Sequence, residues 1–148
     1  MPFGEEGLEG ARVHSVNAVS EIVGIFQKHG YVELDTAYAY TGGTSEAFLG
    51  ALEPSIEERG LRVSTKLWPG RIKHTREDLR AGLATSLERL RVNKVDIFYL
   101  HAPDRTTLFE ETFKATDELF KEGRFARVSA RMKVLFGNFD GFCVAGNI

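Results

Sequence analysis

The sequence has little cysteine and no apolar segment long enough to cross a membrane. Its single cysteine, Cys143, excludes an internal disulfide and suits a reducing compartment. A membrane-spanning helix needs about 20 consecutive apolar residues, and no run here approaches that length. The N-terminus also lacks the basic start and apolar stretch of a signal peptide. These absences predict a cytoplasmic protein without a membrane partner.

An excess of charge of one sign is also missing. The 19 lysines and arginines nearly balance the 21 acidic residues, and the basic residues are scattered along the chain. A nucleic-acid-binding protein needs a basic patch, so no nucleic-acid partner is predicted. The lone cysteine has no metal-ligand spacing around it, and no metal site is predicted. With 148 residues, 43% of them hydrophobic, the chain is expected to form one globular domain.

What the sequence does contain is an alternation of β-like and helical segments. Runs rich in β-branched and aromatic residues start near residues 31, 61, 95 and 124, and the run at 124–129 is the weakest. Their spacing of about 30 residues is that of a βαβ unit, which predicts parallel strands joined by right-handed crossovers. The intervening segments with helical periodicity are 15–29, 44–52, 75–90 and 107–123.

Two of these helices begin with a sequence typical of a capping box, in which a hydroxyl and an acidic residue three positions later satisfy free backbone N–H groups. Thr75 is followed by Asp78, and Thr107 is followed by Glu110. Along the last helix, aromatic residues recur at helical spacing, and we predict that they belong to the core. They are Phe109, Phe113 and Phe120.

Three of the predicted strands end on an ionisable residue. The segment 31–35 ends at Asp35, 61–66 at Lys66 and 95–101 at His101. The carboxyl ends of parallel strands lie at one edge of the sheet, where the active sites of α/β proteins are built. We therefore expect a carboxylate, an ammonium and an imidazole to converge there. No G-x-G-x-x-G motif follows a strand, so a Rossmann nucleotide site is not predicted.

The segment 35–40, Asp-Thr-Ala-Tyr-Ala-Tyr, resembles the Asp-Thr-Ala-x-x-Tyr signature of the aldo-keto reductases. These are NADP(H)-dependent enzymes built on a (β/α)8 barrel. Thr65-Lys66 and the segment 96–101 resemble the lysine and histidine strands of that family, and 101–112 is similar to the branch of aflatoxin aldehyde reductases. The resemblance implies an α/β fold, a partial (β/α)8 TIM barrel with three to four βα units and parallel strands, incomplete at both ends.

The resemblance covers residues 1–128, which we assign to a partial reductase domain. Residues 129–148 are expected to be a divergent tail, and the chain a truncated form. The positions at which the family binds most of its nucleotide have no match in the sequence, so the activity of the chain is left open. A partial barrel would also expose sheet edges, which favours self-association.

By resemblance, the protein would reduce aldehydes or ketones to alcohols with hydride from NADPH. Tyr40 would be the general acid, and Lys66 would stabilise the phenolate left after proton donation. Asp35 would pair with Lys66 and contact the cofactor, and His101 would orient the carbonyl oxygen. Trp68 would form a wall of the pocket for this small carbonyl substrate.

Each of these residues also has a structural interpretation: Asp35 as a turn cap, Lys66 as a surface cation, His101 as a satisfied imidazole and Trp68 as a packing residue. Chemistry alone does not separate Tyr38 from Tyr40, and only the motif spacing selects Tyr40.

Two alternatives to an enzyme stay open. One is a non-catalytic fragment of the same family that acts as an interaction or regulatory module. The other is an unrelated doubly wound α/β domain that binds a metabolite at its rim, which would carry helices on both faces of its sheet.

Overall fold

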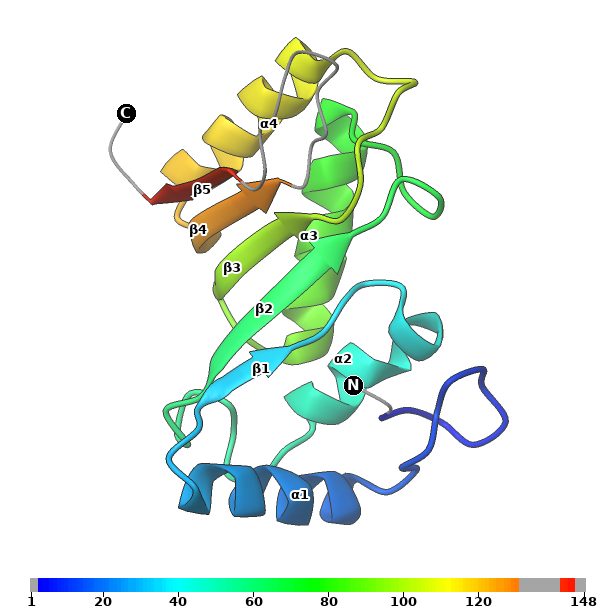
Figure 1. The fold of residues 1–148 in the computed structure, drawn as a ribbon, viewed down its shortest axis with the longest axis vertical. Coiled ribbons are helices and arrows are strands. Elements are labelled where there is room, and N and C mark those ends of the chain that lie inside the picture. The colour runs from blue at the N-terminus through cyan, green and yellow to red at the C-terminus, as the bar shows by residue number, and fades with distance from the viewer. Residues whose placement is uncertain (1–2, 131–141, 146–148) are drawn as a thin grey trace.

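The computed structural model describes residues 3–130 and 142–145 and contains one five-stranded sheet (Figure 1). The strands lie in chain order: β1 (Glu33–Asp35), β2 (Arg62–Leu67), β3 (Val95–Leu100), β4 (Phe125–Ala130) and β5 (Phe142–Ala145). Strands β1 to β4 are parallel, which confirms the predicted α/β architecture and the fourth strand. Strand β5 pairs antiparallel with β4 and was not predicted. The rest of the expected tail, 131–141 and 146–148, lies outside the described residues.

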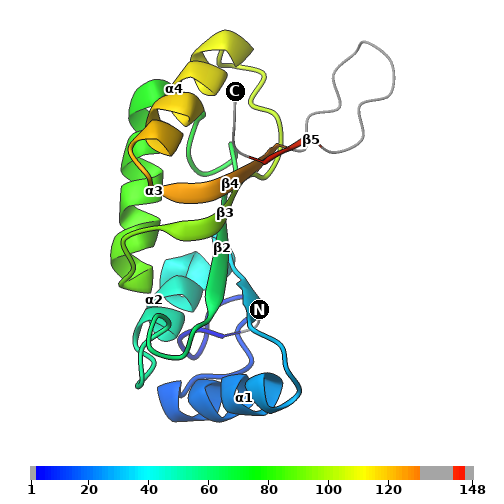
Figure 2. The same cartoon turned by 90° about the vertical axis from the view of Figure 1, so that its left-hand side faces the viewer.

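The helices cover only one face of this sheet. They are α1 (Val16–Lys28), the short 3-10 helix η1 (Tyr40–Gly43), α2 (Thr44–Gly50), α3 (Arg76–Leu90) and α4 (Phe109–Lys121). Figure 2 shows α2, α3 and α4 on one side of the sheet and α1 beyond the β1 end. Within the described part of the chain no helix lies over the other face, which we call the open face. The alternative of a doubly wound domain with helices on both faces was therefore wrong.

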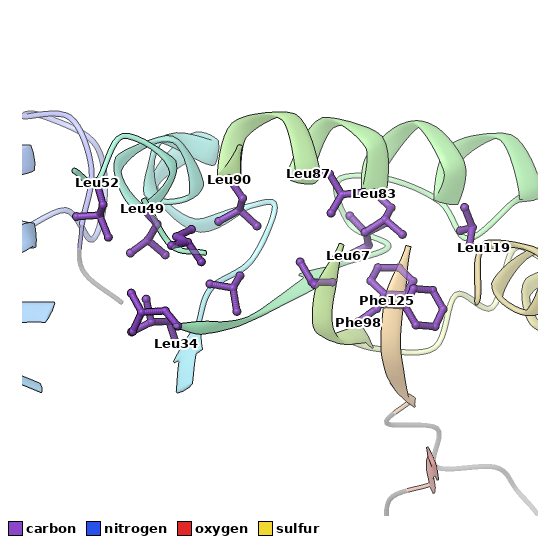
Figure 3. Packing of buried hydrophobic residues seen from close by; sticks show 14 of the residues in the cluster. Leu34, Leu49, Leu52, Leu67, Leu83, Leu87, Leu90, Phe98, Leu119 and Phe125 are labelled. Atoms are coloured by element: carbon purple, nitrogen blue, oxygen red, sulfur yellow. The ribbon is translucent and has the colours of Figure 1, made fainter. Parts of the chain in front are cut away.

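The core lies between the sheet and the helices. Parallel pairing places registered residues on the same face, and Thr65 is paired with Phe98 and Leu67 with Leu100. Four leucines of α3 at helical spacing are buried against them: Leu79, Leu83, Leu87 and Leu90. Figure 3 shows this packing over β2 and β3. Each buried leucine contributes roughly 1.5–3 kcal/mol relative to an exposed one.

Of the two predicted capping boxes, only the first forms its hydroxyl cap. The hydroxyl of Thr75 accepts a hydrogen bond from the backbone N–H of Asp78 at the start of α3. The prediction for Thr107 was wrong, because the cap position of α4 is Leu108. The Thr107 hydroxyl instead donates to the buried carboxylate of Asp104, 2.8 Å away. A hydrogen bond to a charged acceptor is stronger than one between neutral groups, which favours this position of the hydroxyl.

The prediction that the phenylalanines of α4 form core was also wrong. Phe113 is 53% exposed, and Phe109 and Phe120 are exposed as well. The face of α4 that packs is the adjacent one, made of Thr112, Ala115, Thr116 and Leu119. Periodicity identifies a face of a helix but not which face meets a neighbour, and here the small side chains make the contact.

None of the helices in residues 3–130 is long and apolar enough to span a membrane.

Candidate active site

The chain stays beside β2 after β1 has ended. The backbone N–H of Thr36 donates to the carbonyl of Ser64, and that of Tyr38 donates to the carbonyl of Lys66. The chain then turns sharply through three residues with positive φ, of which Thr41 is not a glycine. This loop carries Tyr40, the first residue of η1, to the end of β2.

Lys66 is the centre of the cluster that results. Its ammonium donates to the Asp35 carboxylate at 2.5 Å and to the backbone carbonyl of Thr36 at 2.8 Å. The side chain of Lys66 is 12% exposed, whereas that of Asp35 is 60% exposed. The pair therefore lies at the surface of the molecule with the carboxylate turned towards solvent. Its electrostatic contribution to stability is small, because water screens such pairs.

Two tyrosine rings flank the same ammonium. The Lys66 Nζ atom lies 5.1 Å from the centroid of the Tyr40 ring and 5.6 Å from that of Tyr99. Both distances fall in the range of cation–π attraction. Tyr99 was not predicted as a site residue from the sequence. The feature that identifies Tyr99 is the strand register, which pairs it with Lys66.

The structure separates the two candidate tyrosines of the motif. Tyr38 is stacked against Arg89 of α3, whose Cζ atom is 4.7 Å from its ring centroid, and its backbone carbonyl accepts from Arg89 Nη1. Tyr40 is the tyrosine beside Lys66. Geometry therefore favours the same residue that the motif spacing selects.

His101 and Trp68 lie on the loops that leave the neighbouring strand ends. His101 follows β3, and its backbone N–H donates to the carbonyl of Leu67, the last residue of β2. The His101 side chain is exposed at this rim. Trp68 follows Leu67 directly, is 45% exposed, and lies against Gly70, where a Cβ atom would come within 2.5 Å of its ring. The structure thus joins Asp35, Tyr40 and Lys66 by direct contacts and places His101 and Trp68 on adjacent loops.

The cluster belongs to the open face of the sheet. Lys66 is registered with Tyr99, one position away from the pair Thr65 and Phe98 that meets the helices. Successive strand residues point to opposite faces, so Lys66 and Tyr99 point away from the helix layer. Within residues 3–130 and 142–145, no helix covers this face.

The loops after β2 and β3 are fastened together below this rim. The buried carboxylate of Asp104 accepts hydrogen bonds from the backbone N–H of His74 and from the N–H and hydroxyl of Thr106. Burial raises the pKa of Asp104, but these bonds together with that from Thr107 outweigh it and hold the pKa well below the usual range. Burial lowers the pKa of His74. The network fixes the loops that carry Trp68 and His101.

The chemistry of the cluster is that of proton donation beside a fixed cation. Tyr40 offers an O–H group and Lys66 a positive charge, and an accessible carboxylate stands next to them. A phenol beside a fixed ammonium can protonate a carbonyl oxygen, but no side chain can supply a hydride. In the part of the chain that the structure describes, no group of three or more His, Cys, Asp or Glu side chains could hold a metal ion.

Comparison with known proteins identifies the family. The sequence model of the Aldo/keto reductase family matches residues 2–131. The chain belongs to this family.

The relatives include aflatoxin B1 aldehyde reductases, as predicted. Aflatoxin B1 aldehyde reductase member 2 of Mus musculus is 39% identical over 124 residues, which are 82% of this chain and 34% of the relative. The protein of the same name from Homo sapiens is 40% identical with the same coverage. The aldo-keto reductase pigE of Monascus ruber is 38% identical over 137 residues, covering 85% of this chain and 40% of the relative. The chain thus spans about a third of the length of these curated relatives.

Solved structures agree on the fold. A thermostable aldo-keto reductase, Tm1743, crystallised with the inhibitor epalrestat, matches 84% of this chain and 46% of its own, with a TM-score of 0.70 and 29% identity. An aldo/keto reductase from Klebsiella pneumoniae, in complex with NADP and acetate, matches 79% of this chain and 41% of its own, with a TM-score of 0.66 and 24% identity. The fold of the aldo/keto reductase chain is therefore a partial (β/α)8 barrel with four parallel strands.

Proposed function

We propose that this chain serves an NADP(H)-dependent reduction of aldehydes or ketones to alcohols, with Tyr40 as the general acid. The observation that supports it most is the position of the Lys66 ammonium, which contacts Asp35 and faces the Tyr40 ring on the open face. Family membership supports the reaction class, and the word aldehyde in the names of the mouse and human relatives supports the substrate class.

In the proposed reaction, a reduced nicotinamide supplies a hydride to the carbonyl carbon when it is bound. The Tyr40 hydroxyl donates its proton to the carbonyl oxygen, and the alcohol forms. The Lys66 ammonium stabilises the negative charge left on the phenolate. Asp35 holds the ammonium in place, and its exposed carboxylate is also available to the cofactor. His101 would orient the carbonyl oxygen by donating a hydrogen bond.

Further assignments follow from the same proposal. Trp68, half-exposed beside the end of β2, would form a wall of the substrate pocket. We assign residues 1–128 to the reductase domain and 129–148 to a separate tail. The partner would be a small carbonyl compound, and the reaction would take place in the cytoplasm.

The test is a comparison of two tyrosine variants. Tyr40→Phe removes the proposed acid, and we expect the NADPH-dependent reduction of 4-nitrobenzaldehyde to fall by about 10²–10⁴-fold. NADPH binding, measured by the fluorescence of the cofactor, should persist. Tyr38→Phe is the matched control, because Tyr38 contacts Arg89 through its ring and its backbone carbonyl, not through its hydroxyl. Reduction that survives Tyr40→Phe, or a wild-type chain that reduces no carbonyl, would refute the proposal.

A second candidate is a non-catalytic module that associates with copies of itself. It is favoured by the exposed phenylalanines of α4 and by the uncovered sheet face. Analytical ultracentrifugation over a range of concentrations should then show oligomers that Phe113→Glu weakens. Lys114→Glu, which adds the same carboxylate one residue away, should have little effect. A monomer at all concentrations would exclude this candidate.

A further inference from the structure

The guanidinium of Arg89 contacts the loop that carries Tyr40 and the helix α2 that follows it. It stacks on the ring of Tyr38 and donates from Nη1 to the backbone carbonyl of the same residue at 3.3 Å. Its Nη1 atom also lies 3.5 Å from Oε2 of Glu46, the third residue of α2. Between these two residues it lies against Gly43, where a Cβ atom would come within 2.3 Å of Nη1. One side chain of α3 thus touches the loop on both sides of Tyr40.

Glu46 extends this contact to the strand that bears Lys66. Its side chain is fully buried, and Oε1 accepts a hydrogen bond of 2.5 Å from the hydroxyl of Thr65. Burial raises the pKa of Glu46, while the bond from Thr65 and the charge of Arg89 oppose that rise. A buried carboxylate is costly unless it is bonded, so α2, β2 and α3 are tied together at this point.

The loop between Tyr38 and Glu46 needs such support from outside. Thr41, Gly42 and Gly43 all have positive φ, and this backbone is strained at Thr41, which has a Cβ atom. A side chain at Gly43 would displace the guanidinium. The contacts of Arg89 therefore coincide with the segment whose conformation is least favoured on its own.

We infer that Arg89, together with Glu46, is a positioning residue that keeps the Tyr40 ring over the Lys66 ammonium. Arg89 lies in the helix layer, whereas the Tyr40 ring faces Lys66 on the open face of the sheet. The consequence for catalysis rests on the proposed function, but the position of the ring does not.

The position of the ring can be measured without turnover. An aromatic ring shields protons above its face, so the ε-methylene protons of Lys66 should resonate upfield in the NMR spectrum. Lys66→Met identifies the signal, and Tyr40→Leu gives its position once the ring is lost. We expect Arg89→Met to move the signal towards the Tyr40→Leu position, and Arg89→Lys to move it less, since lysine keeps the charge but not the flat stack.

Arg80→Met is the matched control. Arg80 lies on the same helix, but it pairs with Glu122 and Glu118 at the surface. This variant should leave the Lys66 signal unchanged. A folded Arg89→Met protein with the wild-type Lys66 signal would overturn the inference. If Arg89→Met does not fold, Tyr38→Leu removes only the stack, and it should move the signal in the same direction; an unmoved signal there would also overturn it.

Activity provides the second measurement. Displacement of the acid should lower kcat for the reduction of 4-nitrobenzaldehyde by up to about 100-fold in Arg89→Met, with the Kd for NADPH unchanged. If the wild-type chain reduces no carbonyl, the proposed function fails, and the Lys66 signal alone decides the role of Arg89. If the wild-type chain is active and kcat and the Lys66 signal both survive Arg89→Met, the role of Arg89 fails while the proposed function stands.

Discussion

The two faces of the sheet are built from alternate residues of the same strands, yet they have opposite properties. On the face covered by the helices, Thr65, Phe98 and Leu100 are almost completely buried. On the open face, Lys66 and Tyr99 are only partly buried, and the groups that suit proton transfer lie there. Each strand therefore encodes stability and chemistry with a period of two residues.

This difference shows how the molecule can tolerate a polar cluster on a sheet. The side chains of the covered face are packed apolar residues, at the density typical of protein interiors. The open face contributes little to that packing, so its residues are free to serve a ligand. Glu46 is an exception to this separation, because it is an acid buried in the covered layer. It accepts a hydrogen bond from Thr65 of β2 and pairs with Arg89, which contacts the loop of Tyr40.

The largest expected effect comes from the covered face. Phe98 is fully buried and packs on Phe125, with 5.3 Å between ring centroids. Phe98→Ala should lower the free energy of unfolding by about 3–5 kcal/mol, because it removes apolar contacts and leaves a cavity. Denaturant unfolding measures it.

The control for Phe98→Ala is Ile97→Ala, which changes the neighbouring residue on the open face and should cost clearly less. Equal losses at the two positions would show that the open face is covered in solution.

A second pair compares the two faces at a polar position. Thr65→Val keeps the shape of the side chain but removes the hydroxyl that donates to Glu46. We expect a loss of about 1–3 kcal/mol in the free energy of unfolding, because a buried carboxylate loses a partner. Ser64→Ala, one residue earlier and on the other face, should cost less. The difference between the faces would be refuted if both variants had the stability of the wild type.

Much of this arrangement could be predicted from the sequence. The ends of β2 and β3 beside Lys66 and His101, the leucine face of α3 and the Thr75 cap are local patterns, and local patterns are what a sequence displays directly. The assumption that parallel strands end at one edge predicts that Asp35 and Lys66 converge, and the family resemblance adds that they pair.

The remaining features depend on contacts between segments distant in sequence. Tyr99 joins the site through register, and Arg89 reaches Tyr38 from a helix 51 residues later in the chain. The hydroxyl of Thr107 donates a hydrogen bond to Asp104 instead of capping α4. The phenylalanines of α4 lie beside the packed face of the helix rather than on it. In each case the deciding partner is chosen by the fold, and no periodicity within one segment identifies it.

The free energy of unfolding should depend on pH, because a network of titratable residues is buried among the helices and loops. His74 is held there by Asp104 and by the hydroxyl of Thr112, and its pKa is lowered by burial. A group with a lowered pKa stabilises the fold above its unfolded value, about 6.5, and this contribution is lost as the pH falls below it. We expect the free energy of unfolding to decrease between pH 7 and pH 5. It should decrease further below about pH 4, where Asp104 of the unfolded chain takes up a proton that folded Asp104, with its lowered pKa, does not yet bind.

The control for this prediction is a pair of histidine variants. His74→Gln should flatten the decrease between pH 7 and pH 5, whereas His29→Gln, at an exposed position, should leave it unchanged. Glu46 acts in the opposite direction, since its raised pKa favours the folded state at low pH. The prediction therefore concerns the difference between wild type and His74→Gln, and a constant difference across this range would contradict it.

The smallest expected effect on stability is on the open face itself. Tyr99→Leu removes one of the two rings that flank Lys66 and should lower the free energy of unfolding by only about 0.5–1 kcal/mol. The same variant should move the ε-methylene signal of Lys66 downfield, because one shielding ring is lost while Tyr40 stays in place. Tyr99→Phe keeps the ring and should leave the signal near its wild-type position. A large loss of stability in Tyr99→Leu with no movement of that signal would mean that Tyr99 serves the packing. The distinction between a face for stability and a face for chemistry would then fail at a residue whose ring flanks Lys66.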